Sequence, residues 1–372
     1  MGDGTGIEWT DATWNPTRGC SRLSPGCGGP NHQGGCYAEK IAARFSGPGQ
    51  AFEGFAERTQ HGGRWTGKMA VAWDAVDQPI RWRKPRHIFA NSMSDLFHKD
   101  LPRDEVAVIY GTAIAAVHLR GHIIQILTKR ADHMRETLND ESFWDLANSH
   151  AESIVLDHVD PHDRRRDDAR ATLDDYGPDK PAPGIWLGVS TEDQATADER
   201  IPDLMATPAA IRFISAEPLL GPVNVTWALS RNRMDIAAGF LKRGKFSPGA
   251  ETLRPLDWVI TGGESGPHAR PANPDWFRSL RDQCVAAEVS FFFKQWGEWA
   301  PGVAFGMRED GPVSDSKGNV RDWMNRYVTC EDRADRVRSH SFTQHATNLV
   351  YRVGKARAGA TLDGREWREM PS

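Results

Sequence analysis

The chain lacks long hydrophobic runs, a strong excess of charge of either sign, and an apolar N-terminal segment. No stretch approaches the ~18 consecutive apolar residues of a membrane-spanning helix, so we expect no membrane insertion. The formal net charge is −4 over 372 residues, which argues against a broad basic surface for indiscriminate DNA binding. Met1–Thr13 is polar and has no signal-peptide core, which favours a cytoplasmic location.

Cysteine is scarce, but three of the five cysteines lie close together, at Cys20, Cys27 and Cys36. Gly and Pro fill most positions between them, as in a loop that wraps a bound group, because glycine tolerates positive φ. Three clustered thiols without a local fourth indicate a [4Fe–4S] cluster with one iron open to another ligand. A zinc site with His32 as fourth ligand, or a disulfide with a spare thiol, is compatible with the same spacing.

Short apolar segments alternate with helical ones along most of the chain. The expected strands are Thr10–Asn15, Arg86–Ala90, His122–Leu127, Ile185–Val189, Ile211–Ile214, Asp257–Ile260 and Ser290–Phe293. This alternation predicts parallel strands joined by crossover helices, and nearly continuous apolar runs fit strands covered on both faces. We therefore predict an α/β fold: a partial or full (β/α) barrel with six to seven parallel strands. An open doubly wound sheet is the alternative, although no G-x-G-x-x-G turn follows the first strand.

We expect one barrel domain over residues 1–300, which includes the cysteine loop, and a C-terminal extension over 301–372 that packs on it. Two stretches interrupt the alternation and are expected as surface insertions, near 152–183 and near 229–255. Helical periodicity predicts helices over Tyr37–Phe45, Glu105–Leu119, a segment that ends near Leu146, and Pro274–Ala287.

Polar or charged residues follow every predicted strand. In a β/α barrel the carboxyl ends of the strands surround the active site. The cysteine loop is then expected to share one mouth with Asn91, Ser92, Asp95, Thr128, Lys129, Ser190, Glu192, Glu217, Glu264 and Lys294.

An open iron in such a mouth is suited to coordinate the amino and carboxylate groups of S-adenosylmethionine. Electron transfer from the cluster then cleaves the sulfonium and yields a 5′-deoxyadenosyl radical. Gly262 and Gly263 permit close approach, and the Glu264 carboxylate suits an ammonium group. A purely structural pairing of Glu264 with Lys294 or Arg270 is the alternative.

Further residues at the mouth receive cofactor-binding roles in this hypothesis. Asn91, Ser92 and Asp95 are expected to contact the methionine part or the ribose, and Ser190 to line the same site. Tyr37, next to the third cysteine, is expected to wall off the cluster, or else to be the first core residue of its helix.

Three charged residues are expected to face the substrate as catalytic groups: Lys129, Glu217 and Lys294. The plainer alternative is that Lys129 and Arg130, which directly follow a strand, balance Glu217 and Glu264.

Motifs spread along the chain carry a family resemblance. They are Ile7-Glu-Trp-Thr-Asp-Ala-Thr-Trp-Asn-Pro16, Gly19-Cys20, Ser24-Pro-Gly-Cys27, Cys36-Tyr-Ala-Glu39, Asn91-Ser-Met-Ser-Asp-Leu-Phe-His98, Leu127-Thr-Lys-Arg130, Trp186-Leu-Gly-Val-Ser190, Ser215-Ala-Glu-Pro-Leu-Leu-Gly221, Gly262-Gly-Glu-Ser-Gly266, Phe292-Phe-Lys-Gln-Trp-Gly-Glu298 and Leu362-Asp-Gly-Arg-Glu-Trp367. Together they resemble a phage and prophage family of unknown function, whose members resemble radical S-adenosylmethionine enzymes. The resemblance implies an iron–sulfur cluster, an electron donor and a companion called a three-Cys-motif partner protein. The family spaces its second and third cysteines by two residues, whereas Gly28–Gly35 separates them here, which leaves His32 available as a ligand.

These observations lead to competing hypotheses of function. The first is a radical S-adenosylmethionine enzyme that acts on a nucleotide or nucleic acid. The phage resemblance and the 14 tryptophans motivate this substrate, because several of the tryptophans lie in loops where flat rings can stack on planar ligands; tryptophan as a core residue is the alternative. The second is a zinc-stabilised, non-catalytic barrel that binds nucleic acid or a partner protein. The third is a metal-independent lyase or hydrolase that uses Glu217, Glu264 and Lys294 for acid–base work.

Overall fold

The computed structural model describes residues 5–29, 35–160, 171–245, 247–249, 253–301, 320–321, 327–328, 339–341 and 349–371. Its centre is a seven-stranded sheet in the order β1-β6-β7-β8-β9-β10-β11, in which every neighbouring pair is parallel. The strands are β1 (Ala12–Trp14), β6 (His87–Ala90), β7 (Ile123–Thr128), β8 (Ile185–Ser190), β9 (Ile211–Ala216), β10 (Trp258–Gly262) and β11 (Ser290–Gln295). The predicted α/β fold is confirmed as a half-barrel, since β1 and β11 remain the two edges of the described sheet.

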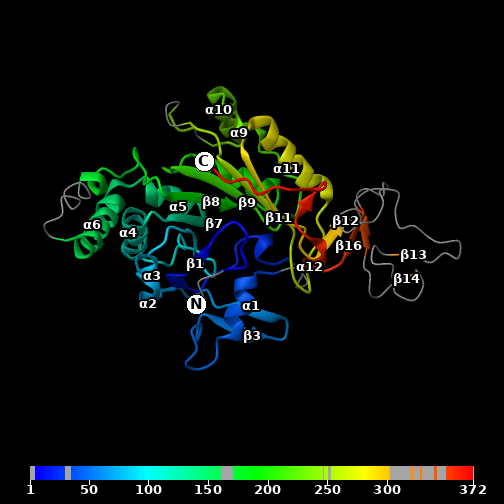
Figure 1. Cartoon of the computed structure of the whole chain (residues 1–372), viewed down its shortest axis with the longest axis horizontal. Helices are drawn as coiled ribbons and strands as arrows, with labels where there is room; N and C mark the ends of the chain where they lie inside the picture. The colour runs from blue at the N-terminus through cyan, green and yellow to red at the C-terminus, as the bar shows by residue number, and fades with distance from the viewer. Residues whose placement is uncertain are drawn as a thin grey trace.

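Helices flank this sheet, as Figure 1 shows. The longer ones are α4 (Arg103–Arg120), α5 (Ala131–Leu138), α6 (Glu141–His158), α8 (Gln194–Met205), α10 (Arg233–Lys242) and α11 (Pro274–Ala287), and the short ones are α2 (Trp73–Val76), α3 (Gln78–Arg81), α9 (Thr226–Leu229) and α12 (Lys355–Ala358). Apolar residues on one face of each strand, such as Ile124, Leu187 and Val259, pack against the helices in one large core. Among the described residues, no helix is long and apolar enough to cross a membrane.

The helix predicted to end near Leu146 is instead two helices, so that prediction was wrong. α5 ends at Leu138, and α6 begins after Asp140, whose side chain accepts a hydrogen bond from the Ser142 backbone at 2.9 Å. Asp is a favoured N-cap residue because its carboxylate satisfies a backbone N–H that has no partner within the helix. α6 then continues to His158, so the start of the expected first insertion belongs to this helix. Residues 161–170 of that insertion lie outside the described chain.

A second core fills the concave side of the half-barrel with aromatic rings. Trp258 of β10 lies edge-on to Trp9, Trp186 and Phe292, with ring centroids 6.0–6.1 Å apart. Phe213 lies against the same ring at 5.6 Å. Edge-to-face packing of this kind adds stability beyond the area that the rings bury. These tryptophans therefore serve as core residues. Their buried rings do not support the hypothesis that tryptophans stack on a planar ligand.

The described part of the C-terminal segment folds back on the strand β11. β12 (Trp299–Pro301) pairs with β16 (Leu349–Arg352), and β16 pairs with β15 (Ser339–Ser341). The remaining short strands are β13 (Val320–Arg321), β14 (Tyr327–Val328), β17 (Thr361–Leu362) and β18 (Arg365–Glu366). Near the end of the chain, the Phe293 backbone N–H donates to the Trp367 carbonyl at 2.9 Å, and the Trp258 indole donates to the Glu369 carbonyl at 2.8 Å. These contacts tie the last residues to β10 and β11.

A small N-terminal layer lies between β1 and β6 in the sequence and carries the cysteine loop. Its elements are β2 (Thr17–Arg18), η1 (Pro25–Cys27), α1 (Tyr37–Arg44), β3 (Ala56–Thr59), β4 (Gly62–Trp65) and β5 (Ala70–Val71). α1 packs on the β3–β4 hairpin through Ala38, Ala42 and Ala43, which meet Ala56 and Trp65. Small residues on this face of α1 let the helix lie close to the hairpin.

Candidate functional site

A cavity of about 310 Å³ lies at the carboxyl ends of the parallel strands, where the cysteine loop meets them. This volume is at the lower end of the ~300–1,000 Å³ that small-molecule sites occupy. The predicted site residues that line it are Cys20, Cys27, Cys36, Tyr37, Asn91, Ser92, Asp95, Lys129, Ser190, Glu217, Gly263, Glu264 and Lys294. Thr128 lines it as well, whereas Gly262 and Glu192 do not. The structure thus brings nearly all of the predicted site residues to one cavity.

The loop that carries Cys27 is fastened to the end of β8. Ser24 donates from its hydroxyl to Glu192 Oε1 at 2.6 Å, and the Cys27 backbone N–H donates to the Ser24 carbonyl at 2.8 Å. Gly26 lies so close that an ideal Cβ there would be 2.3 Å from Glu192 Oε1. Glycine at this position therefore lets the loop approach the strand end, and the contact fixes where Cys27 lies.

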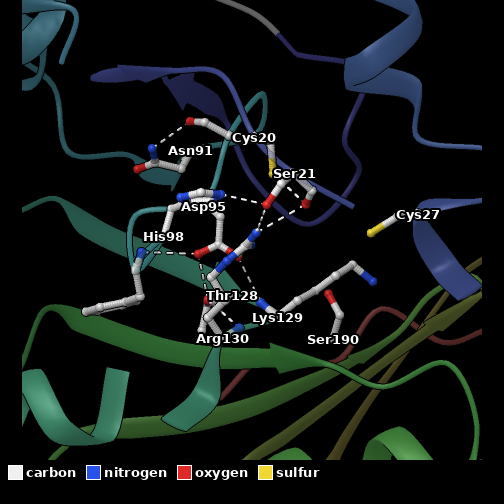
Figure 2. Close-up of polar contacts among 12 residues, drawn as sticks. Cys20, Ser21, Cys27, Asn91, Asp95, His98, Thr128, Lys129, Arg130 and Ser190 are labelled. Carbon is white, nitrogen blue, oxygen red and sulfur yellow. Dashed lines mark hydrogen bonds and ion pairs between the residues drawn. The ribbon is translucent and has the colours of Figure 1, made fainter. Parts of the chain in front are cut away.

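Cys20 lies beside the end of β7. The Arg130 guanidinium donates to the Ser21 carbonyl at 3.1 Å and to the Ser21 hydroxyl at 2.9 Å, and it pairs with Asp95 at 2.8 Å. Figure 2 shows this group beneath Cys20, with Lys129 extending toward Cys27. His98 adds a contact at 2.7 Å to the Ser21 hydroxyl. Each of these two cysteines thus has a cation at its side.

Cys36 directly precedes α1, so the helix positions it. In the first turn of α1 the Glu39 carboxylate is buried and pairs with Arg22 from the cysteine loop, while Glu39 Oε1 also accepts the Trp65 backbone N–H at 2.9 Å. Glu39 belongs to the Cys36-Tyr-Ala-Glu39 motif, but its partner could not be identified from the sequence. The pair joins the loop, the helix and the hairpin.

The three thiols differ in acidity. Burial raises the pKa of the Cys20 thiol to about 12, with a further rise from Asp95 and an opposing effect of Arg130. Burial also raises the pKa of Cys36. At Cys27 burial acts in the same direction, but the Lys129 ammonium and the hydrogen bonds from Leu23 and Ser24 outweigh it, so its pKa lies below the usual value.

Cys27 is therefore expected to be the most reactive thiol of the metal-free protein, because the thiolate is the nucleophile. Limited alkylation with iodoacetamide, read by peptide mass spectrometry, should label Cys27 before Cys20 and Cys36, with the buried Cys284 as internal control. Lys129→Met removes the cation that lowers the Cys27 pKa, so the thiolate fraction of Cys27 and its labelling rate should both fall. Faster labelling of Cys20 than of Cys27 would contradict this electrostatic account.

Two carboxylates at the strand ends, Glu192 and Asp95, form ion pairs with nearby cations. Glu192, after β8, is completely buried and pairs with both Lys129 and Arg200, the latter at 3.0 Å. Asp95, after β6, pairs with Arg130 and accepts the Thr128 hydroxyl at 2.7 Å. The alternative in which Lys129 and Arg130 balance Glu217 and Glu264 is thereby corrected, because the cations of β7 reach the carboxylates of the neighbouring strands.

Glu264 has both carboxylate oxygens engaged. The Arg270 side chain donates to each of them at 2.8 Å, the Arg270 backbone donates at 2.9 Å, and the Gly35 backbone donates at 3.2 Å. This is the structural pairing with Arg270 that was the alternative to binding an ammonium group. It also ties the last turn of the cysteine loop to β10.

Gly262 and Gly263 allow close approach within the protein. An ideal Cβ on Gly263 would lie 1.9 Å from the Trp296 carbonyl, and one on Gly262 would lie 2.3 Å from Glu217 Oε1. The first distance means that the loops after β10 and β11 touch through their backbones. The second means that Glu217 rests directly on the end of β10.

Glu217 and Lys294 face each other across the cavity wall with a loose contact. Lys294 Nζ is 3.4 Å from both carboxylate oxygens of Glu217, and the Ser215 hydroxyl is 3.4 Å from one of them. These distances are longer than those of a strong charge-assisted hydrogen bond, about 2.7–2.9 Å. Both groups therefore retain capacity for a ligand.

Two buried acceptors at the cavity have no partner among the described residues, Asn91 Oδ1 and Gln295 Oε1. The Asn91 amide nitrogen donates to Thr17 at 2.5 Å and to Ser94 at 2.8 Å, and that of Gln295 donates to Ser265 at 3.1 Å. An unsatisfied buried polar group costs roughly 1–3 kcal/mol, so a bound donor at these oxygens would be favourable. Sequence reasoning identified Asn91 but missed Gln295, as it missed Arg22 and Arg200.

Tyr37 stands at the rim of the cavity. It is 51% exposed, so it is not a core residue of its helix, and its hydroxyl donates to the Ser92 carbonyl. Tyr37 therefore joins α1 to the end of β6.

Two serines at the cavity are held by neighbouring groups. The Ser92 hydroxyl is 3.2 Å from Asn15 Oδ1, and the Ser190 carbonyl accepts a hydrogen bond from the Arg200 guanidinium at 2.7 Å.

Among the described residues, no group of three or more His, Cys, Asp or Glu side chains is arranged to hold a metal ion. His32, the alternative fourth ligand, lies outside the described chain.

No curated protein matches the chain. The family described as "Protein of unknown function (DUF5131)" matches residues 4–371, which is nearly the whole chain. The match also confirms the expected membership in a family without an established function. The chain belongs to the DUF5131 family.

Proposed function

We propose that this protein is an iron–sulfur enzyme of the radical S-adenosylmethionine type, acting on a nucleotide or nucleic acid. The observation that carries the proposal is that Cys20, Cys27 and Cys36 line one cavity at the carboxyl ends of the half-barrel strands. They lie near enough to influence one another's ionisation, since Cys27 and Cys36 both raise the pKa of Cys20.

The charges around the cavity fit a set of thiolate ligands. Cysteine binds metals as thiolate, so each ligand adds a negative charge that nearby cations must offset. Lys129 lies beside Cys27, and Arg130 lies beside Cys20. Each of these cations also pairs with a buried carboxylate, Lys129 with Glu192 and Arg130 with Asp95. Glu192 is shared between Lys129 and Arg200, which leaves positive charge in excess next to Cys27.

The residues of the wall fit a nucleoside cofactor. When bound, a [4Fe–4S] cluster and S-adenosylmethionine would together supply a 5′-deoxyadenosyl radical. Cys20, Cys27 and Cys36 would hold the cluster. The unpartnered oxygens of Asn91 and Gln295 would accept hydrogen bonds from ammonium or ribose hydroxyl groups.

Other predicted residues act in this proposal by positioning. Asp95 holds Arg130 and accepts the Lys129 backbone N–H at 3.1 Å, which fixes the end of β7. Glu264 fixes the loop through Arg270. Ser92 and Ser190 shape the wall.

Glu217 and Lys294 are the proposed substrate-facing pair. Their 3.4 Å contact lets a polar substrate group enter between them, where Lys294 binds it and Glu217 holds or accepts its proton. Lys129 instead compensates the charge of Cys27. An electron donor, a three-Cys-motif partner protein and a phage or prophage origin complete the proposal by family resemblance.

The experiment is anaerobic incubation of iron-loaded protein with S-adenosylmethionine and dithionite, followed by mass spectrometry of the nucleosides. We expect 5′-deoxyadenosine and methionine in a constant ratio. Glu217→Gln should still form 5′-deoxyadenosine, because that residue faces the substrate rather than the cofactor. Iron-loaded protein that leaves S-adenosylmethionine intact under reduction would contradict the proposal.

A further inference from the structure

The helix α1 presents an apolar and basic face to solvent. Its opposite face is buried against the hairpin through Ala38, Ala42 and Ala43. The exposed residues follow helical spacing on one side and are Tyr37, Lys40, Ile41, Arg44 and Phe45. Ile41 is 42% and Phe45 44% exposed, which is unusual for large apolar side chains placed along one stripe. The stripe, hereafter the α1 face, is therefore a candidate contact surface.

Three cations accompany these rings. Lys40 and Arg44 lie one turn apart on α1, and the exposed Arg58 donates to the Arg44 carbonyl at 2.8 Å, which brings its guanidinium to the same end of the helix. None of the three pairs with a carboxylate in the part of the chain that the structure describes. The Arg44 guanidinium lies 5.6 Å from the centre of the Phe45 ring. Positive charge here contrasts with the net charge of −4 of the whole chain.

The α1 face leads into the cavity. Tyr37 lines the cavity and forms one end of the face. Lys40 Nζ lies at the rim, because an ideal Cβ on Gly35 or on Gly266 would be 3.6 Å from it. From Tyr37 to Phe45 the helix rises about 12 Å, at 1.5 Å per residue, which is room for a few nucleotides. A ligand along this face would therefore have its end at the site.

We propose that the α1 face binds single-stranded nucleic acid, with phosphates on Lys40, Arg44 and Arg58 and bases stacked on Tyr37 and Phe45. Unpaired bases stack on aromatic rings regardless of sequence, and cations track the backbone. Base stacking requires unpaired bases, and the chain carries no broad excess of positive charge for a duplex. The inference names the substrate class of the proposed function and rests on it for what happens in the cavity, whereas binding itself requires neither iron nor cofactor.

The test is fluorescence anisotropy of a labelled single-stranded 12-mer, DNA and RNA, with the full chain free of metal. The double variant Arg44→Ala/Phe45→Ala should weaken binding at least tenfold and lower the salt dependence by about 0.7 in slope for the one lost phosphate contact. The control is Arg83→Ala/Lys84→Ala, two exposed cations that precede β6 at the opposite end of the strands, and it should bind like the parent chain.

Four outcomes would overturn the inference: no binding by the parent chain, equal binding by both double variants, equal binding of a duplex, or displacement by poly-glutamate as effective as by the oligonucleotide. The last would assign the α1 face to an acidic protein instead. Because binding is measured without metal, its failure in a protein that still forms 5′-deoxyadenosine would refute the α1 face alone. Binding without any 5′-deoxyadenosine would support the α1 face and refute the proposed function.

Discussion

Cys27→Ala will leave the protein folded but unable to retain iron and sulfide after anaerobic reconstitution. The substitution removes one of three proposed ligands and the thiolate beside Lys129. We expect bound iron to fall to less than roughly a tenth of the parent value, since among the described residues no cysteine besides Cys20, Cys27 and Cys36 lines the cavity and could replace the lost ligand. The broad absorption near ~400 nm that sulfide-to-iron charge transfer produces should disappear with it.

The matched control is Cys284→Ala. Cys284 is fully buried, but it lies on α11 and does not line the cavity. This variant should lose about 1 kcal/mol of stability from reduced packing and keep its iron. If Cys27→Ala retains iron as well as the parent, Cys27 is not a ligand. If both variants lose it, the loss reflects the fold rather than the site.

Glu192→Gln will lower the free energy of unfolding by about 3–5 kcal/mol in urea, because it leaves the buried Arg200 and the half-buried Lys129 without this compensating charge. The isosteric amide keeps the volume and can still accept the Ser24 hydroxyl, so the change reports the missing charge. We also expect weaker iron retention, since the loop that carries Cys27 is fastened to this carboxylate.

Glu199→Gln provides the comparison for this effect. Glu199 lies on the same helix, α8, but is exposed, so its neutralisation should change stability by less than about 0.5 kcal/mol. A Glu192→Gln variant as stable as Glu199→Gln would show that the buried network of charges does not hold the strand end together.

The strands were predictable because two sequence signals identify each of them. Each is a short apolar run, and each is followed by polar residues, as in Phe89-Ala90 before Asn91. The extent of closure was not predictable, because whether β1 and β11 meet depends on strand tilt and not on any local pattern. The break between α5 and α6 was missed even though Asp140 is a favoured cap, since the apolar periodicity continues past it.

The site was predictable in its membership but not in its pairings. Parallel strands bring their carboxyl ends to one edge, so Asn91, Lys129 and Glu217 were expected to meet. Which carboxylate pairs with which cation depends on differences of a few ångströms in side-chain position. Lys129 forms its ion pair with Glu192 rather than with Glu217. The tryptophans show the same limit: Trp9 lies between the polar residues Glu8 and Thr10 in the sequence, yet its ring becomes part of the core once the sheet curves around it.

The most direct test is the quantity of iron, acid-labile sulfide and zinc per chain in protein purified without oxygen. The account predicts about four iron and four sulfide per chain and no stoichiometric zinc. One zinc with neither iron nor sulfide would contradict it and favour a zinc-stabilised, non-catalytic barrel.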